Sequence, residues 1–262
     1  MSFESHNPVG SHHAQTCGLC GARTARPAFS RGGAMWWKCR ECGLFFVHPQ
    51  PEAPTLSKAY ESAYYDSPSD YSADSMAVWE ERMSAIETVC EPGVVLDVGC
   101  GRGHFMMSAM RRGWDAWGLE IAVGAVKELP ESLRARVTVG ELESAPFKRG
   151  TFDLLTYFDV IEHVREPVEF LRHGHDLLRP AGHLVITTPN AATLKARLKG
   201  RYWKYFDFRR YLHLYHFTPH TLELALQQAG FEVATWLRRQ GMPLWVVTRK
   251  VERGRSRAAR RR

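Results

Sequence analysis

Apolar residues follow two alternating patterns along residues 91–250. Short runs rich in β-branched and aromatic residues predict buried strands, and segments with apolar residues at helical spacing predict helices. The expected strands cover 94–97, 114–120, 136–139, 152–159, 183–188, 231–238 and 244–249. The expected helices cover 74–90, 122–129, 167–178 and 219–229, with one more starting near 103. Because strand and helix alternate, the pattern predicts an α/β domain with a mostly parallel sheet and helices on both faces.

Residues 189–217 interrupt this alternation with a segment rich in aromatic and basic side chains. The segment leaves the carboxyl end of the strand at 183–188, and open α/β sheets bind ligands at that edge. We therefore expect residues 189–217 to form a lid over a ligand, with some of its aromatic side chains packed on the core.

The residues outside this domain divide into shorter segments. Residues 1–14 are polar, lack apolar periodicity and are expected to be a disordered tail. Residues 15–50 contain four cysteines, residues 51–90 combine a proline-containing linker with an amphipathic helix, and residues 251–262 form a basic tail. The chain has no apolar run of the ~20 residues that a membrane span needs and no secretion signal, so we expect a soluble, cytoplasmic protein.

The net charge of +7 is concentrated in two segments. Residues 195–210 and residues 250–262 each hold seven Lys or Arg and one acidic residue, so each carries +6. The rest of the chain therefore carries −5. A basic segment at the ligand edge favours an anionic small molecule or an anionic membrane surface as its partner.

Four cysteines form two pairs with the spacing of a zinc site, Cys17-x2-Cys20 and Cys39-x2-Cys42, with 18 residues between the pairs. Four thiolates complete the tetrahedral shell of a structural zinc ion. A segment this short cannot bury enough apolar surface to fold alone, so the metal is expected to hold it together as a zinc ribbon.

A glycine-rich loop follows the first strand of the α/β domain in the order Asp97-x-Gly99-x-Gly101-x-Gly103. Glycines let a ligand approach the backbone, and the helix that starts near Gly103 directs free N–H groups toward it. Glu120 ends the second strand, at about the spacing at which an acid meets a ribose diol in nucleotide-binding sheets. The loop departs from the G-x-G-x-x-G order of dinucleotide sites, which disfavours NAD.

The Asp-x-Gly-x-Gly-x-Gly loop resembles the first motif of the class I S-adenosylmethionine-dependent methyltransferases, and the segment 39–51 resembles the zinc ribbon ahead of many bacterial methyltransferases. The resemblance implies a doubly wound, seven-stranded, Rossmann-like sheet with an antiparallel last strand, preceded by a small zinc ribbon. It also implies the residues that bind S-adenosylmethionine: Asp97, Gly99, Cys100, Gly101, Gly103, Glu120, Ile121, Glu141, Leu142 and Phe158. Glu141 stands where the family usually has the Asp that meets the adenine amino group.

The implied reaction is an in-line methyl transfer, for which the protein aligns the acceptor and removes a proton. His216, His213 and His163 are the candidates for the base, because each is expected at the ligand edge. We favour His216, then His213, because the lid should close over the acceptor. The residues Asp159, Glu162 and His163 also resemble a segment of quinone-biosynthesis O-methyltransferases that can ligate a divalent cation. A hydrogen-bonded network is the other interpretation of this cluster.

These observations predict a methyltransferase that acts, most plausibly at oxygen, on a small or carrier-borne anionic acceptor. Two alternatives stay open: an RNA methyltransferase that grips the nucleic acid through its basic segments, and a non-catalytic cofactor-binding scaffold whose ribbon docks a partner. The acidic remainder of the chain disfavours nucleic acid. The pattern predicts no oligomeric state.

Overall fold

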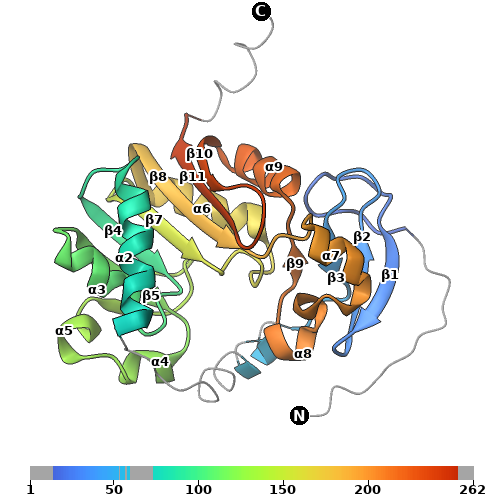
Figure 1. The fold of residues 1–262 in the computed structure, drawn as a ribbon, viewed down its shortest axis with the longest axis horizontal. Coiled ribbons are helices and arrows are strands. Elements are labelled where there is room, and N and C mark those ends of the chain that lie inside the picture. The colour runs from blue at the N-terminus through green and yellow to red at the C-terminus, as the bar shows by residue number, and fades with distance from the viewer. Residues whose placement is uncertain (1–13, 53, 57, 60–72, 253–262) are drawn as a thin grey trace, which may run out of the picture.

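The structure, a computed structural model, describes residues 14–52, 54–56, 58–59 and 73–252 (Figure 1). Apart from residue 14, the expected N-terminal tail lies outside the described residues, and so do residues 253–262 of the basic tail. None of the helices in this described part of the chain combines the length and hydropathy that a bilayer crossing requires.

A seven-stranded sheet forms the centre of the α/β domain. In spatial order its strands are β10 (Phe231–Arg238), β11 (Leu244–Lys250), β8 (Leu178–Thr188), β7 (Phe152–Phe158), β4 (Val94–Val98), β5 (Asp115–Glu120) and β6 (Val137–Val139). Strand β11 runs antiparallel to both of its neighbours, and the pairings from β8 across to β6 are parallel. The predicted mostly parallel sheet with an antiparallel last strand is confirmed.

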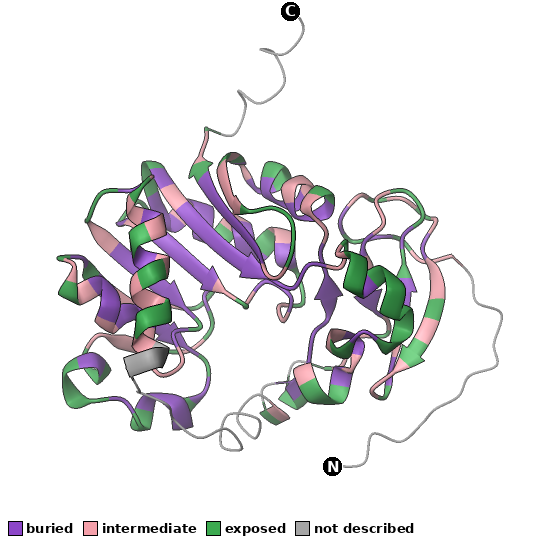
Figure 2. Ribbon diagram, viewed as in Figure 1, coloured by how far each residue is buried: buried purple, intermediate pink, exposed green. Residues whose placement is uncertain are grey.

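Helices cover both faces of this sheet, because successive strand residues point to opposite faces. Val95 packs in a hydrophobic cluster with α2 (Ala73–Glu87) and α3 (His104–Arg111), whereas its neighbour Leu96 packs with α6 (Pro167–Leu177) and α9 (Pro219–Ala229). Both side chains are fully buried, as Figure 2 shows for the central strands in general. The shorter helices α4 (Val123–Lys127) and α5 (Glu131–Arg134) follow β5 at the far edge of the sheet.

Local signals fix the ends of α9 as predicted. The Thr218 hydroxyl accepts a hydrogen bond from the Thr221 N–H at 3.2 Å, Pro219 occupies the first helical position, and Gly230 ends the helix with a φ of 93°. The start of β8 differs from the prediction, because the strand begins at Leu178 instead of residue 183. Pairing of Leu178 with Phe152 extends the strand through the turn-like residues 180–182.

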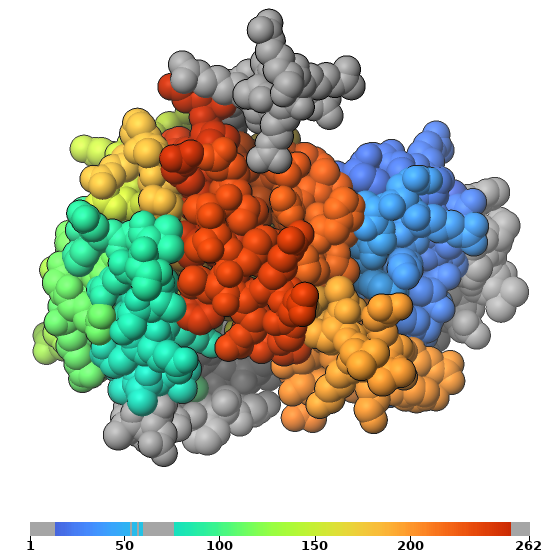
Figure 3. All heavy atoms as spheres, turned by 45° about the horizontal axis from the view of Figure 1, so that its top comes forward, coloured from blue at the N-terminus to red at the C-terminus, as the bar shows by residue number. Residues whose placement is uncertain are grey.

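A second, four-stranded sheet contains the ribbon and part of the insert at 189–217. Its antiparallel order is β1 (Arg26–Arg31), β2 (Ala34–Lys38), β3 (Phe45–Val47) and β9 (Tyr215–His216). The other elements of the insert are α7 (Leu194–Lys199), the 3-10 turns η1 (Gly200–Tyr202) and η2 (Lys204–Phe206), and α8 (Phe208–Tyr211). In Figure 3 the orange atoms of the insert lie directly against the blue atoms of the ribbon.

Aromatic side chains fill the space between the ribbon and the insert. Trp36 of β2 and His216 of β9 are both completely buried, and Trp203 and Phe206 of the insert pack against His216. The insert, expected to be a lid, is therefore also part of the ribbon's sheet and core. Only a short stretch of it, Arg210 to Leu212, faces the cavity described below. The domain boundaries remain a prediction.

Candidate active site

The glycine-rich loop turns sharply between β4 and α3. Gly99, Gly101 and Gly103 have φ angles of 72°, 51° and 70°, in the left-handed region that glycine adopts without strain. A Cβ atom on Gly99 would approach the Val160 side chain to 2.8 Å. The glycines are thus required by the backbone and by the close packing of the loop, whose Gly99, Gly101 and Gly103 N–H groups donate to Leu119, Glu120 and Cys100.

Two buried carboxyl groups flank this loop. Asp97, only 3% exposed, accepts a hydrogen bond of 2.7 Å from the Thr156 hydroxyl. Burial raises the pKa of Asp97 to about 7, and the neighbouring Glu120 adds to the rise. Glu120 accepts backbone hydrogen bonds from Gly101 at 2.8 Å and Ala122 at 2.9 Å, and burial raises its pKa as well.

A cavity of about 720 Å³ opens beside the loop. Seven of the ten predicted cofactor residues line it: Gly99, Gly101, Glu120, Ile121, Glu141, Leu142 and Phe158. The other three, Asp97, Cys100 and Gly103, belong to the same loop but are buried and do not line the cavity. The opposite wall comes from the segment after β7 and from the insert, and includes His163, Val164, Arg165, Glu166, Arg210, Tyr211 and Leu212. One cavity therefore joins the glycine-rich loop to the basic and aromatic end of the insert.

The three candidate histidines are close together, but they face different surroundings. His163 lines the cavity, its Nδ1 lies 3.3 Å from the Leu212 carbonyl oxygen, and burial lowers its pKa to about 4. The ring of His213 is 4.7 Å from that of His163. His216 does not line the cavity: its Nε2 lies 3.0 Å from the Tyr205 carbonyl oxygen, inside the ribbon–insert core. Its role as the base stays a prediction, and the geometry favours His163.

A polar cluster lies behind His163. The Glu162 carboxylate is fully buried and accepts a 2.9 Å hydrogen bond from Thr188, while its Oε1 lies 3.9 Å from His213 Nε2. Glu162 Oε1 has no hydrogen-bond partner among the described residues, and burial raises the pKa of Glu162 well above its usual value. Ligand atoms of Glu162, His163 and His213 lie within 4.8 Å of one another, so His213 takes the position expected for Asp159 in a candidate cation site.

Arg82 of α2 is a charged residue near the site that the sequence pattern did not single out. Burial lowers its pKa, and the carboxylates of Asp159 and Asp97 act in the opposite direction. Its guanidinium carbon lies 4.4 Å from the ring centroid of Trp79 and 5.3 Å from that of Phe158, a cofactor-site residue. A basic residue beside the apolar positions of an amphipathic helix is the only sequence signal for it.

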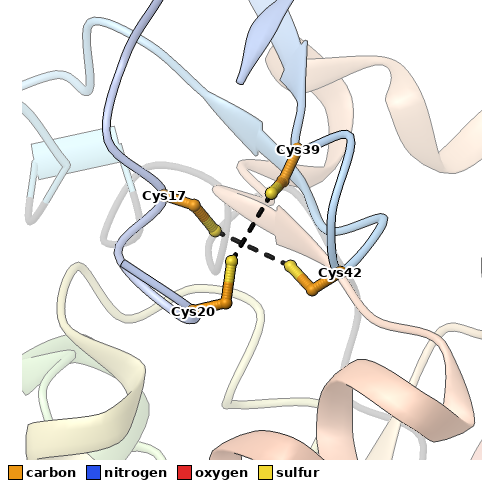
Figure 4. Close-up of side chains that lie close together, drawn as sticks. All are labelled: Cys17, Cys20, Cys39 and Cys42. Atoms are coloured by element: carbon orange, nitrogen blue, oxygen red, sulfur yellow. Dashed lines mark hydrogen bonds between the residues drawn. The ribbon is translucent and has the colours of Figure 1, made fainter. Parts of the chain in front are cut away.

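The four cysteines of the ribbon converge on one point (Figure 4). The sulfur atoms of Cys17 and Cys42 are 3.7 Å apart, and those of Cys20 and Cys39 are 3.6 Å apart. Zinc–sulfur bonds of about 2.3 Å in a tetrahedron place sulfur atoms about 3.8 Å apart, so the cluster fits a zinc ion. The clustering of the four cysteines predicted from their spacing is confirmed.

Comparison with known proteins agrees with this geometry. Residues 77–235 match the family model described as a methyltransferase domain. Ubiquinone biosynthesis O-methyltransferases are 33% identical over 105 residues in Acinetobacter baumannii (37% of this chain, 44% of the relative) and 34% identical over 109 residues in Xanthomonas campestris (39% and 46%). The chain thus spans less than half the length of these relatives.

Solved structures with the same fold include S-adenosylmethionine-dependent methyltransferases from two further organisms. The protein from Mesorhizobium loti has a TM-score of 0.53 at 20% identity, covering 65% of this chain and 98% of that one. The protein from Archaeoglobus fulgidus has a TM-score of 0.53 at 17% identity, covering 67% and 94%. At such identities the likeness shows the fold alone, but the family model covers more than half of the chain. The chain therefore belongs to this methyltransferase family and has the fold of the class I S-adenosylmethionine-dependent enzymes.

Proposed function

We propose that the chain methylates an oxygen atom of a small or carrier-borne, negatively charged acceptor. The observation that carries the proposal is the single cavity that joins the glycine-rich loop and Glu120 to Arg165, Arg210 and Tyr211. A methyl donor held at the loop and an anion held by the two arginines would share this space. Proximity of this kind supplies much of the rate of a displacement reaction.

The charged side chains around the loop suit the polar groups of S-adenosylmethionine. Glu120 would accept the ribose hydroxyls, and Glu141 the adenine amino group. The ionised form of Asp97 and the guanidinium of Arg82 would suit the ammonium and carboxylate ends of the methionyl group. When bound, the cofactor supplies a methyl group activated by a positively charged sulfur.

His163 is the favoured base because it lines the cavity shared with the insert. With a pKa of about 4 its imidazole is neutral near pH 7 and can accept a proton, but only as a weak base. A weak base suits a hydroxyl that is already acidic, such as a phenol or an enol, better than an alkyl alcohol. The relatives named as ubiquinone biosynthesis O-methyltransferases support oxygen as the acceptor atom.

A divalent cation held by Glu162, His163 and His213 is a second way to activate the acceptor. The unpartnered oxygen of Glu162 and the cluster of ligand atoms support it. Such a cation would lower the pKa of a bound hydroxyl so that its proton could pass to solvent, and His163, as a ligand, would not act as the base. Turnover measured with and without added Mg²⁺, in protein that keeps its ribbon metal and in its Glu162→Gln variant, separates the two routes, because only the cation route predicts an activation by Mg²⁺ that the variant loses.

Transfer of labelled methyl groups tests the proposal. The full chain is incubated with methyl-labelled S-adenosylmethionine and a small-molecule extract, and labelled products are identified by mass spectrometry. We expect an anionic O-methylated product that is absent with Asp97→Ala. Failure of the wild-type chain to bind S-adenosylhomocysteine in calorimetry would overturn the proposal.

The RNA alternative makes a different prediction for the basic tail. If RNA is the acceptor, deleting residues 253–262 should weaken RNA binding steeply and flatten its salt dependence. For a small acceptor the same deletion should change turnover little. A scaffold, the third possibility, would bind the cofactor but label no product with any extract.

A further inference from the structure

We propose that the four-cysteine ribbon positions the acceptor side of the cavity, by holding residues 206–212 of the insert in place. This inference rests on the proposed function only where it calls that part of the cavity the acceptor side. The contact between the ribbon and the cavity wall is independent of which molecule is methylated.

The first contact is made by β2 and β3 of the ribbon. Strand β3 pairs with β9 of the insert, with His216 opposite Phe45. Trp36 of β2 donates a hydrogen bond of 2.9 Å from Nε1 to the Phe206 carbonyl oxygen and stacks on His216, with ring centroids 4.7 Å apart. A buried indole N–H needs such a partner, so the hydrogen bond fixes where Phe206 lies.

The second contact is made by the turn between β1 and β2. The Arg209 N–H donates a hydrogen bond of 3.1 Å to the Gly32 carbonyl oxygen, and Arg31 pairs with Asp207 at 3.7 Å. Gly32 has a φ of 61°, and a Cβ atom there would overlap the backbone nitrogen of Phe208. The ribbon turn and the start of α8 are therefore in direct backbone contact.

The segment held by these contacts leads directly into the cavity wall. Residues Arg210, Tyr211 and Leu212 follow the anchored segment and line the wall. Leu212 has a φ of 54°, a left-handed conformation that a leucine rarely adopts unless the surroundings impose it. Its carbonyl oxygen faces His163 Nδ1 at 3.3 Å. The wall next to the candidate base thus depends on a strained residue supported by the ribbon.

The metal site connects to the same contacts. Cys39 follows the last residue of β2, and Cys42 lies between β2 and β3, so a bound ion would fix the two strands that hold the insert. Small modules of this kind depend on their metal for folding. Loss of the metal should therefore loosen residues 206–217 and the cavity wall, and leave the glycine-rich loop intact.

Hydrogen exchange on the full chain tests this coupling. Exchange is compared by mass spectrometry before and after removal of metal with a chelator, and again after zinc is returned. We expect peptides covering 206–217 to exchange about ten-fold faster without metal and to recover with zinc, because exchange reports local opening. Peptides covering 94–103 and the affinity for S-adenosylhomocysteine should change little.

Two glycine variants distinguish loss of the contact between Gly32 and Phe208 from a general loss of stability. Gly32→Ala introduces a methyl group against Phe208, whereas Gly150→Ala has a similar φ of 68° but meets nothing within 4 Å. The two variants share the backbone strain and differ in the contact. Only Gly32→Ala should speed exchange at 206–212, with zinc content unchanged.

A tryptophan pair tests the buried contact in the same way. Trp36→Phe removes the hydrogen bond to Phe206, and Trp37→Phe removes the equivalent 3.1 Å bond from Trp37 Nε1 to the His48 carbonyl oxygen. Faster exchange at 206–217 is expected for Trp36→Phe alone. Unchanged exchange at 206–217 in the metal-free protein and in Gly32→Ala would overturn the inference. That result would leave cofactor binding and methyl transfer untouched, so the two proposals fail separately.

Discussion

Trp36 of the ribbon stacks on His216 of the insert, with ring planes inclined by 26°. Burial lowers the pKa of His216 to about 3, so the imidazole is neutral in this aromatic core. His216→Ala should leave a cavity and lower the free energy of unfolding by roughly 3 kcal/mol. Chemical denaturation measures this loss directly.

Turnover distinguishes that packing role from catalysis. If His216 were the base, His216→Ala would keep its affinity for the cofactor and lose about 10²-fold in turnover, with partial rescue at high pH. We expect instead that His163→Ala shows this pattern, because His163 lines the cavity. Normal turnover in His163→Ala, with the cation route also excluded, would leave proximity as the only source of catalysis.

The ribbon should hold about one zinc ion per chain. Elemental analysis of protein kept reduced should find this zinc, and changing Cys39 and Cys42 to Ser should remove it. Cys90→Ser is the control, because Cys90 is a buried cysteine outside the cluster. Affinity for S-adenosylhomocysteine should stay within a few-fold of the wild type in both variants. Absence of metal from the wild type would contradict the assignment.

The predictable parts of this fold were those with local signals. Strand β4, the glycine-rich loop and the ends of α9 could each be predicted, because each is specified by the types and spacing of residues only a few positions apart in the sequence. The pairing of β9 with β3 was missed, because a two-residue strand has no period of its own and its partner is far away in the sequence. The sequence favours His216 as the base on its position in the chain alone, and this role stays a prediction. Its position in the chain indicated the ligand edge, but its contact with Trp36 is set by tertiary packing.

The basic residues of the insert should differ in their effect on the acceptor. Arg210 lines the cavity, whereas the side chain of the neighbouring Arg209 lies against Gly33 of the ribbon, where its Nε would be 3.1 Å from an added Cβ atom. Arg210→Glu should raise KM for an anionic acceptor about ten-fold or more and change KM for the cofactor little, since it reverses a charge at the wall. Arg197→Glu makes the same charge change on the exposed helix α7, away from the cavity, and is the control. Equal effects of Arg210→Glu on both constants would argue against an anionic acceptor.

Cofactor binding should depend on pH through Asp97. Burial raises the pKa of this carboxyl from its usual value to about 7, so it is largely protonated at pH 6 and largely ionised at pH 8. If the ionised form accepts the ligand's ammonium group, affinity for S-adenosylhomocysteine should fall about ten-fold for each pH unit below 7. Calorimetry from pH 6 to pH 8 measures this, and Asp97→Asn should bind weakly with no such dependence.

A second variant tests whether the pKa of Asp97 sets the pH at which the affinity for S-adenosylhomocysteine changes, here called the binding midpoint. The Thr156 hydroxyl donates to Asp97 at 2.7 Å and lowers the pKa of the carboxyl, in opposition to burial. Thr156→Val removes the donor at nearly constant volume, so the pKa of Asp97 should rise and the binding midpoint should move to higher pH. A midpoint that moves to lower pH, or a dependence that persists in Asp97→Asn, would assign the titration to another group. Glu120 is the nearest alternative, because its pKa is also raised by burial and it lines the same cavity.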